Sequence, residues 1–147
     1  YSMQVSDEST SLIAGLNITK NTENWSYGGQ ITFKNKIDDK EWSFGNSITL
    51  NGWTGKNLSD SIFGSIRLSY TDIDSIDGRD MRIMAPVQTA NPENYGGSNY
   101  KLSFGLNKRL SNGDNLDFEL SIPFEQKLNG PQMEEDLILI LGYKKGF

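Results

Sequence analysis

Seven charged side chains stand within stretches where apolar and polar residues alternate, and these residues are the best placed to do chemistry. Each lies on the polar side of its stretch, so in a β-sheet their charges would share one face. If that face encloses a water-filled channel, opposed charges would line it and set its selectivity. In a narrow channel they would instead pair with one another across the interior. The residues are Lys34, Arg67, Lys101, Arg109, Asp117, Glu119 and Glu125.

Four aspartates at short spacing, Asp72, Asp74, Asp77 and Asp80, form a second candidate site, with Gly78 between the last two. Their oxygen-ligand density suits a weakly held Ca²⁺ ion. The run lacks the bidentate glutamate that an EF-hand loop requires. The alternative is a solvated loop in which Asp and Gly simply make turns.

The chain has no cysteine and no histidine. It therefore has no disulfides or thiolate metal ligands, and it lacks the commonest general base and most zinc sites. The adjacent carboxylates Glu134, Glu135 and Asp136 have no nucleophile or base beside them, and we interpret them as an exposed strand end. We predict a protein that is not an enzyme and holds no cofactor. The net charge of -5 argues against a nucleic-acid partner.

The elements that must position these residues are β-strands, because apolar and polar residues alternate with a period of two and no segment keeps a helical period. Pro123, on a polar face, predicts a bulge. Compact turns are expected at 20–24, 55–59 and 111–114, and one long connection at 72–99. The predicted strands cover 11–19, 25–34, 42–51, 62–71, 100–110, 115–125 and 137–147.

Strands of this kind fit two architectures. In a soluble barrel or sandwich the apolar face is the core, whereas in a transmembrane barrel it meets lipid. Three features favour lipid. The polar faces are rich in Ser, Thr, Asn, Gln and Gly, and compact turns alternate with longer connections. Aromatic residues also cluster near strand ends, as interfacial girdles require; these are Trp25, Tyr27, Trp42, Tyr70, Tyr100, Phe124, Tyr143 and Phe147.

We therefore predict an all-β, antiparallel, up-and-down transmembrane β-barrel of about 7–8 strands, with residues 1–147 forming one β-barrel domain or the C-terminal portion of a larger one. Seven strands alone do not close a barrel, and an open edge cannot face lipid. Residues 1–7 could add an eighth strand, earlier strands could be missing, or another chain could complete the barrel. The last strand resembles the closing strand of Gram-negative outer-membrane barrels, which implies that Phe147 is the membrane-insertion signal.

A set of short motifs extends this resemblance over most of the chain. The motifs are Trp25-Ser-Tyr-Gly28, Asn51-Gly-Trp53, Ile76-Asp-Gly-Arg-Asp80, Pro86-Val-Gln-Thr-Ala-Asn-Pro92, Gly96-Gly97, Gly105-Leu-Asn107, Ile122-Pro-Phe-Glu-Gln126 and Leu128-Asn-Gly-Pro-Gln-Met133. Together they resemble the C-terminal half of the outer-membrane transporter family grouped with the meta-pathway phenol-degradation proteins. The resemblance implies an extracellular loop motif of Asp77, Gly78, Asp80, Gly96 and Gly97, in which Asp77, Gly78 and Asp80 lock the loop.

The expected function is a transporter-like passive pore or uptake channel for a small molecule in the outer membrane of a Gram-negative bacterium. The expected partners are the lipid bilayer, the barrel-assembly machinery and a solute that the sequence does not identify. Two alternatives stay open. One is a non-conducting structural or adhesive barrel that works through its long loop. The other is a soluble β-barrel or sandwich binding module with its apolar faces inward.

Overall fold

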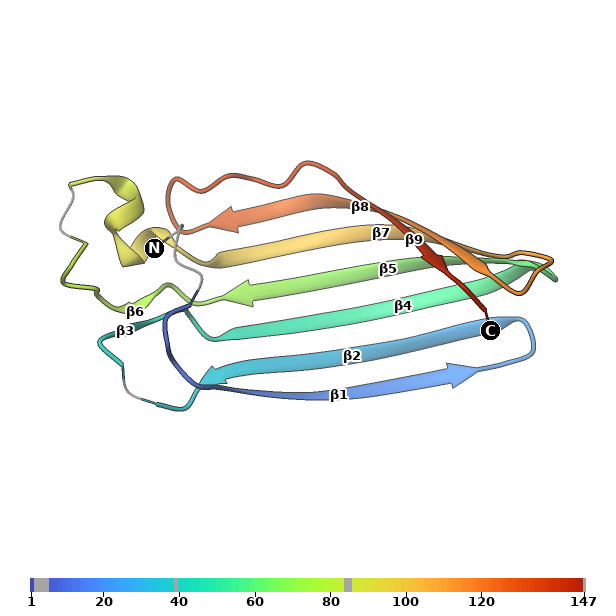
Figure 1. The fold of residues 1–147 in the computed structure, drawn as a ribbon, viewed down its shortest axis with the longest axis horizontal. Coiled ribbons are helices and arrows are strands. Elements are labelled where there is room, and N and C mark those ends of the chain that lie inside the picture. Colours follow the sequence, from blue (N-terminus) through green and yellow to red (C-terminus); the bar gives the residue numbers. More distant parts are fainter. Residues whose placement is uncertain (2–5, 39, 84–85, 147) are drawn as a thin grey trace.

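The chain folds around one antiparallel β-sheet in which strands follow one another in sequence order (Figure 1). The computed structural model describes residues 1, 6–38, 40–83 and 86–146. The predicted all-β, up-and-down arrangement of seven strands is confirmed. In order across the sheet the strands are β1 (Ser11–Asn21), β2 (Trp25–Lys36), β4 (Ser47–Ser59), β5 (Ile62–Ile73), β7 (Gly97–Arg109), β8 (Asn115–Leu128) and β9 (Ile138–Lys144).

The connections differ in length at the two ends of the sheet. At one end, called here the turn end, lie the short connections 22–24, 60–61 and 110–114. The other end, the loop end, carries residues 37–46, 74–96 and 129–137. Within these loops a two-residue strand β3 (Trp42–Ser43) pairs with β6 (Asp77–Gly78), and two short 3₁₀ turns follow, η1 (Gln88–Ala90) and η2 (Pro92–Asn94). The predicted alternation of connection lengths is therefore confirmed.

Cross-strand pairing gathers the apolar side chains into rows on one face of the sheet. One row runs through Leu16, Ile31, Leu50, Tyr70 and Tyr100, which are consecutive partners from β1 to β7. Such rows follow from the strand period of two, because every second residue points to the same side. This apolar face is open to the surroundings: among the described residues, no apolar side chain of the seven strands is buried.

The only cluster of buried apolar residues among those described lies outside the sheet, at the loop end. Tyr1, Trp42 and Ile76 form it, and the rings of Tyr1 and Trp42 meet edge to face with centroids 5.0 Å apart. Phe44 and Tyr95 pack against this cluster. Trp42 was expected in an interfacial girdle, but it lies in this buried cluster at the loop end instead.

Three sequence-based boundaries are wrong. Residues 55–59 do not form a turn but continue β4, and the chain reverses at Asp60–Ser61. Residues 42–51 are not one strand, because β3 belongs to the small sheet and β4 starts at Ser47. The long connection is 74–96, shorter than expected, since β5 and β7 both extend into the predicted loop.

The sheet does not close into a barrel within the described residues. β1 and β9 are its two edges, and β9 runs at a steep angle to β1 in Figure 1 because the sheet is strongly twisted. Tyr1, Ser6 and Asp7 do not belong to a strand, and the rest of the proposed eighth strand, residues 2–5, lies outside the described residues. No helix that the structure describes is long and apolar enough to cross a membrane.

Candidate functional site on the polar face of the sheet

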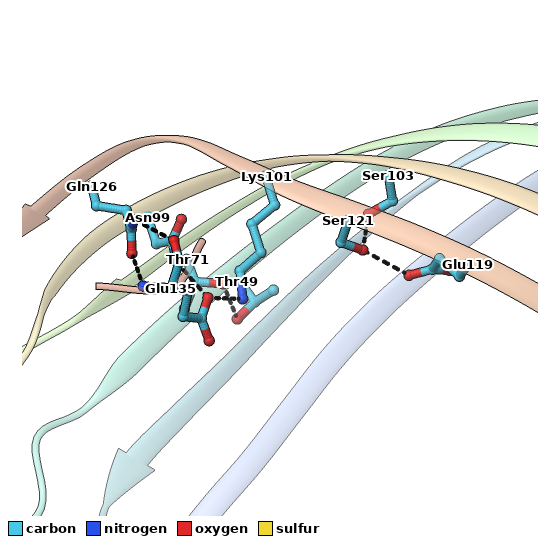
Figure 2. A network of polar contacts seen from close by, with 9 residues as sticks. All are labelled: Thr49, Thr71, Asn99, Lys101, Ser103, Glu119, Ser121, Gln126 and Glu135. Atoms are coloured by element: carbon cyan, nitrogen blue, oxygen red, sulfur yellow. Dashed lines mark hydrogen bonds and ion pairs between the residues drawn. The ribbon is translucent and has the colours of Figure 1, made fainter. Parts of the chain in front are cut away.

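The polar face of the sheet is held by side-chain hydrogen bonds between neighbouring strands. Ser103 on β7 and Ser121 on β8 are opposite each other in the register, and their Oγ atoms lie 2.7 Å apart. Both serines are almost fully buried, at 3% and 4% exposure. The Ser121 hydroxyl also donates to Glu119 Oε1 at 3.2 Å (Figure 2). Small polar residues are therefore the enclosed part of this sheet.

Arg67 and Glu119 form an ion pair across an intervening strand. Arg67 lies on β5 opposite Ser103, and Glu119 lies on β8 opposite Gly105, so the pair spans β7. At Gly105, between the two strands, a Cβ atom would lie 2.4 Å from the Ser65 hydroxyl oxygen, so a larger residue would displace Ser65. Two of the seven predicted lining residues are thus brought together, and they pair with one another as the narrow-channel alternative expects.

Two aromatic side chains on the same face were not predicted from the sequence. Trp53 lies over Gly28, where a Cβ atom would come within 2.5 Å of the indole. Phe63 lies over Gly55 in the same way, with a corresponding distance of 2.2 Å. Their positions on the polar side of each strand make them look like interruptions of the alternation. The only signal in the sequence was the glycine directly opposite or diagonal to each ring.

A cavity of about 350 Å³ lies between these aromatics and the Arg67–Glu119 pair. Gln30 and Asn51 form another part of its wall, with Asn51 Nδ2 3.5 Å from Gln30 Oε1. Asn51 Oδ1 accepts a hydrogen bond from the Ser69 hydroxyl at 2.7 Å. Among the described residues Arg67 Nε is buried without a hydrogen-bond partner. We call this cavity the Trp53 pocket.

At the loop end, the segment 129–137 is fastened to the polar face through Glu135. Lys101 Nζ lies 2.6 Å from Glu135 Oε2, and Asn99 Nδ2 donates to the same oxygen at 3.0 Å (Figure 2). The side-chain amide of Gln126 bonds both the backbone N–H and the backbone C=O of Glu135, at 3.0 and 2.8 Å. Lys101 therefore pairs with a carboxylate that the sequence had suggested was part of an exposed strand end.

A second cavity, of about 380 Å³, lies beside this fastened segment. Its walls include apolar groups from Phe44, Ile76, Tyr95 and Met133, together with Lys101. The Gln132 side chain donates to the Gly96 carbonyl at 2.7 Å and holds the loop segments together at one side.

The remaining predicted lining residues do not gather at one point. Asp117 accepts a hydrogen bond from Asn107. Within the described residues Lys34 and Arg109 form no ion pair, and Arg109 is exposed near the turn end.

Glu125 does not lie on the polar face, so its prediction as a lining residue is wrong. The predicted bulge at Pro123 is confirmed: Lys101 pairs with Pro123 while the preceding Tyr100 pairs with Glu125. The extra residue shifts the alternation by one, and this moves Glu125 beside Tyr100 on the apolar side. There Glu125 pairs with Lys127, 2.9 Å away.

The possible Ca²⁺ site does not form. Among the described residues no three acidic side chains come together to hold a metal ion. Asp77 Oδ2 lies 2.6 Å from Lys36 Nζ, and this hydrogen bond lowers the pKa of the Asp77 carboxyl. Asp80 is buried and binds the Arg82 guanidinium through both oxygens, at 2.9 and 3.0 Å. Asp72 is part of β5. Neighbouring cations, rather than a metal, therefore balance two of the four aspartates.

The loop-motif residues contact neighbouring segments of the loop end. Gly78 has φ of +75°, and a Cβ there would lie 2.2 Å from the Glu41 carbonyl oxygen. Gly96 and Gly97 also have positive φ and close backbone neighbours. The Asp80 N–H donates to the Tyr1 hydroxyl at 2.7 Å. Only glycine fits such positions without strain, so these contacts agree with a loop-locking role.

A carboxylate at the turn end, Asp114, was also not predicted as a site residue. It is buried and accepts hydrogen bonds from the Tyr143 hydroxyl, the Gly146 N–H and the Asn112 amide. The hydrogen bond from Tyr143 is the main cause that lowers the pKa of Asp114. Asp114 thus joins the end of β9 to the β7–β8 turn. Phe147, the predicted insertion signal, lies outside the described residues.

Comparison of the chain with models of protein families, with curated proteins and with solved structures finds no match.

Proposed function

We propose that this chain forms part of the wall of a transmembrane β-barrel in a Gram-negative outer membrane and serves as a passive pore or uptake channel for a small molecule. The observation that carries the proposal is the reversed burial of the sheet. Leu16, Leu68 and Leu141 are 61%, 51% and 73% exposed, whereas Ser103 and Ser121 are almost fully enclosed. A water-soluble sheet buries its apolar face, because exposed apolar area is costly. Lipid removes that cost for the apolar side.

Strand length supports the same environment. The six strands from β1 to β8 in the large sheet have 11 to 14 residues. A tilted strand needs about 9–11 residues to cross the hydrocarbon region. Each of these strands is therefore long enough to cross a bilayer and reach beyond it.

Aromatic side chains on the apolar face lie near both ends of the strands, where lipid interfaces favour them. Near the loop end, Tyr70 and Tyr100 have ring centroids 4.6 Å apart, and the Phe124 ring lies 5.9 Å from Tyr100. Near the turn end, Trp25 is exposed, with Lys56 Nζ 5.3 Å from its ring centroid. We place the loop end outside the cell and the turn end in the periplasm, with the insertion machinery reading Phe147.

The open edges of the sheet require further strands. An odd number of antiparallel strands leaves β1 and β9 running in the same direction. Closing the barrel with antiparallel pairs only therefore takes an odd number of additional strands. We propose that a further part of the protein or another chain supplies them, as the resemblance to larger outer-membrane transporters implies. This closure satisfies the edge N–H and C=O groups that lipid cannot bond.

A non-conducting barrel is the second candidate function. Two observations favour it: the Arg67–Glu119 bridge lies over the polar face, and Glu135 fastens the segment 129–137 at the loop end. In that case the loop end would be the working surface.

The test compares the protein, together with the strands or partner chain that complete its barrel, in buffer and in detergent micelles by circular dichroism and by gel migration with and without heating. A β-rich species whose migration changes on heating, and which forms only in detergent, is the expected result. A monodisperse β-rich protein in plain buffer would overturn the proposal. Conductance in planar bilayers then separates the two candidates, since a barrel with a blocked interior gives no current steps. A Glu135→Ala variant that begins to conduct would show that the fastened segment is the barrier.

A further inference from the structure

The Trp53 pocket combines an aromatic surface with a rim of polar groups that carries no net charge. We propose that it binds a small neutral solute with one flat apolar face and hydrogen-bonding groups along its edge. The inference rests on the proposed function, because it names the class of solute that the polar face would take. It stands on the geometry of described side chains in four strands, β2, β4, β5 and β8.

The aromatic surface explains the flat apolar face of the solute. Trp53 and Phe63 belong to neighbouring strands, and both lie on a face where most other side chains are small and polar. Gly28 and Gly55 leave the space that the two rings occupy. An apolar ring face stacks favourably on such side chains because dispersion and the aromatic quadrupole act together. A solute that is polar on every side would gain nothing from this surface.

The charge balance of the pocket favours a neutral solute. Its only cation and its only anion among the described lining residues are Arg67 and Glu119, and these already pair with each other. An anionic solute would have to compete with Glu119 for the guanidinium, and a cationic one with Arg67 for the carboxylate. Breaking such a pair leaves a charge without its partner, which is costly away from bulk water.

The rim supplies the hydrogen bonds. The hydroxyls of Ser26 and Ser65 line the cavity and can donate and accept hydrogen bonds. The amides of Gln30 and Asn51 lie side by side, and each keeps a donor or acceptor position beyond the contact between them. The volume of about 350 Å³ falls within the range of about 300–1,000 Å³ that small-molecule sites occupy.

A sugar ring and a flat heterocycle share this chemistry, so the test uses one probe of each kind, D-glucose and uracil. The full chain is folded in detergent micelles, and binding is followed by titration calorimetry, which does not depend on tryptophan emission. We expect at least one probe to give a saturable heat of binding. A charged relative of the bound probe, gluconate or orotate, should bind more weakly.

Two pocket variants and one matched control locate the site. Trp53→Leu removes the aromatic surface and Gln30→Ala removes part of the rim, and each should weaken binding by about tenfold. Gln30→Ala is the safer variant for folding, because it removes no ring from the face. Thr32→Ala removes a polar group from the same strand and the same face as Gln30 but outside the pocket, and it should leave affinity within about twofold.

The outcomes separate this inference from the proposed function. If the chain folds only in detergent but neither probe binds, or if both pocket variants bind like the unaltered chain, the inference is overturned and the membrane proposal stands. If the chain folds in plain buffer and a probe binds in a Trp53-dependent manner, the membrane proposal falls and the pocket remains. Tighter binding of the charged relative would overturn the neutral-solute assignment.

Discussion

At the scale of single residues, carboxylates hold separate segments of the chain together by accepting their hydrogen bonds. Asp7 accepts a hydrogen bond from the Phe44 N–H at 2.7 Å, and Asp114 at the turn end holds the last strand through Tyr143 and Gly146. Burial opposes the charged form of Asp7, but its hydrogen bonds to the backbone of Phe44 and Ser9 outweigh burial and lower its pKa. Asp7 therefore ties its segment to Phe44 at the loop end, and Asp114 ties β9 to the β7–β8 turn.

The pKa of Asp114 predicts acid sensitivity at the turn end. Because its folded pKa lies below the ordinary value of 3.8, its contribution to stability is full above that value and is lost as the pH falls through the folded pKa. We expect the urea concentration at the unfolding midpoint, measured in detergent, to be lower at about pH 2.5 than at about pH 6. This decrease should be larger in the unaltered chain than in Asp114→Asn. The variant should already be less stable at the higher pH.

The control for this experiment is Asp60→Asn, which changes an exposed carboxylate in another connection of the turn end. It should behave like the unaltered chain at both pH values. Equal acid sensitivity in the unaltered chain and in Asp114→Asn would contradict the role given to Asp114.

At the scale of elements, glycine backbone geometry decides how the loop end folds. Gly78 allows β6 to lie against β3, because its φ is positive and the Glu41 carbonyl leaves no space for a Cβ. We expect Gly78→Ala to destabilise the loop end by more than the roughly 1–2 kcal/mol that a left-handed conformation alone costs. Faster thermolysin cleavage within 74–96 is the readout.

Gly113→Ala is the matched comparison, since Gly113 also has positive φ but nothing lies within 4 Å of the place where a Cβ atom would stand. It should cost only the conformational term and leave cleavage within 74–96 unchanged. If both variants expose 74–96 equally, the β3–β6 pair does not hold the loop end.

The period of two was enough to predict the strands, because each side chain on a strand has only two faces to choose from. It could not predict the true length of β4. Gly52 and Gly55 look like turn residues, yet both pair with neighbouring strands in the sheet. Glycine fits at position 55 because the Phe63 ring occupies the space that a side chain would need. Pro123 predicted the bulge, but only the observed register shows that the shift carries Glu125 to the other face.

The candidate site was predicted only in part, because its contacts depend on the order of the strands and the path of the loops, which the period of two does not define. The pairing of Arg67 with Glu119 depends on which strands are neighbours. The short turn 110–114 makes β7 and β8 adjacent, whereas β5 and β7 are joined by the long connection 74–96. The partner of Lys101 is in the irregular segment before β9, whose path no periodicity defines. Trp53 and Phe63 were missed because they break the polar alternation that was used to assign the face.

At the scale of the whole molecule, the two faces of the sheet should respond oppositely to the same substitution. Leu106 and Asn107 are neighbours on β7 and point to opposite faces. In lipid vesicles, Leu106→Lys should lower the free energy of unfolding, by less than the roughly 2–4 kcal/mol that a lysine costs at the bilayer midplane, because Leu106 lies towards the turn end of β7. Asn107→Lys should cost little, because its side faces the hydrated interior. Equal costs at the two positions would contradict the assignment of faces.

The central claim is that the apolar face of the sheet meets lipid. It is tested most directly by fluorescent probes attached to single cysteines along β5, with the chain reconstituted in vesicles that carry nitroxide groups on their acyl chains. The chain has no cysteine of its own. Probes at Ile66 and Leu68 should be strongly quenched, whereas probes at Ser65 and Ser69 should not. Quenching that is equal on both faces, or stronger at the serines, would contradict the account.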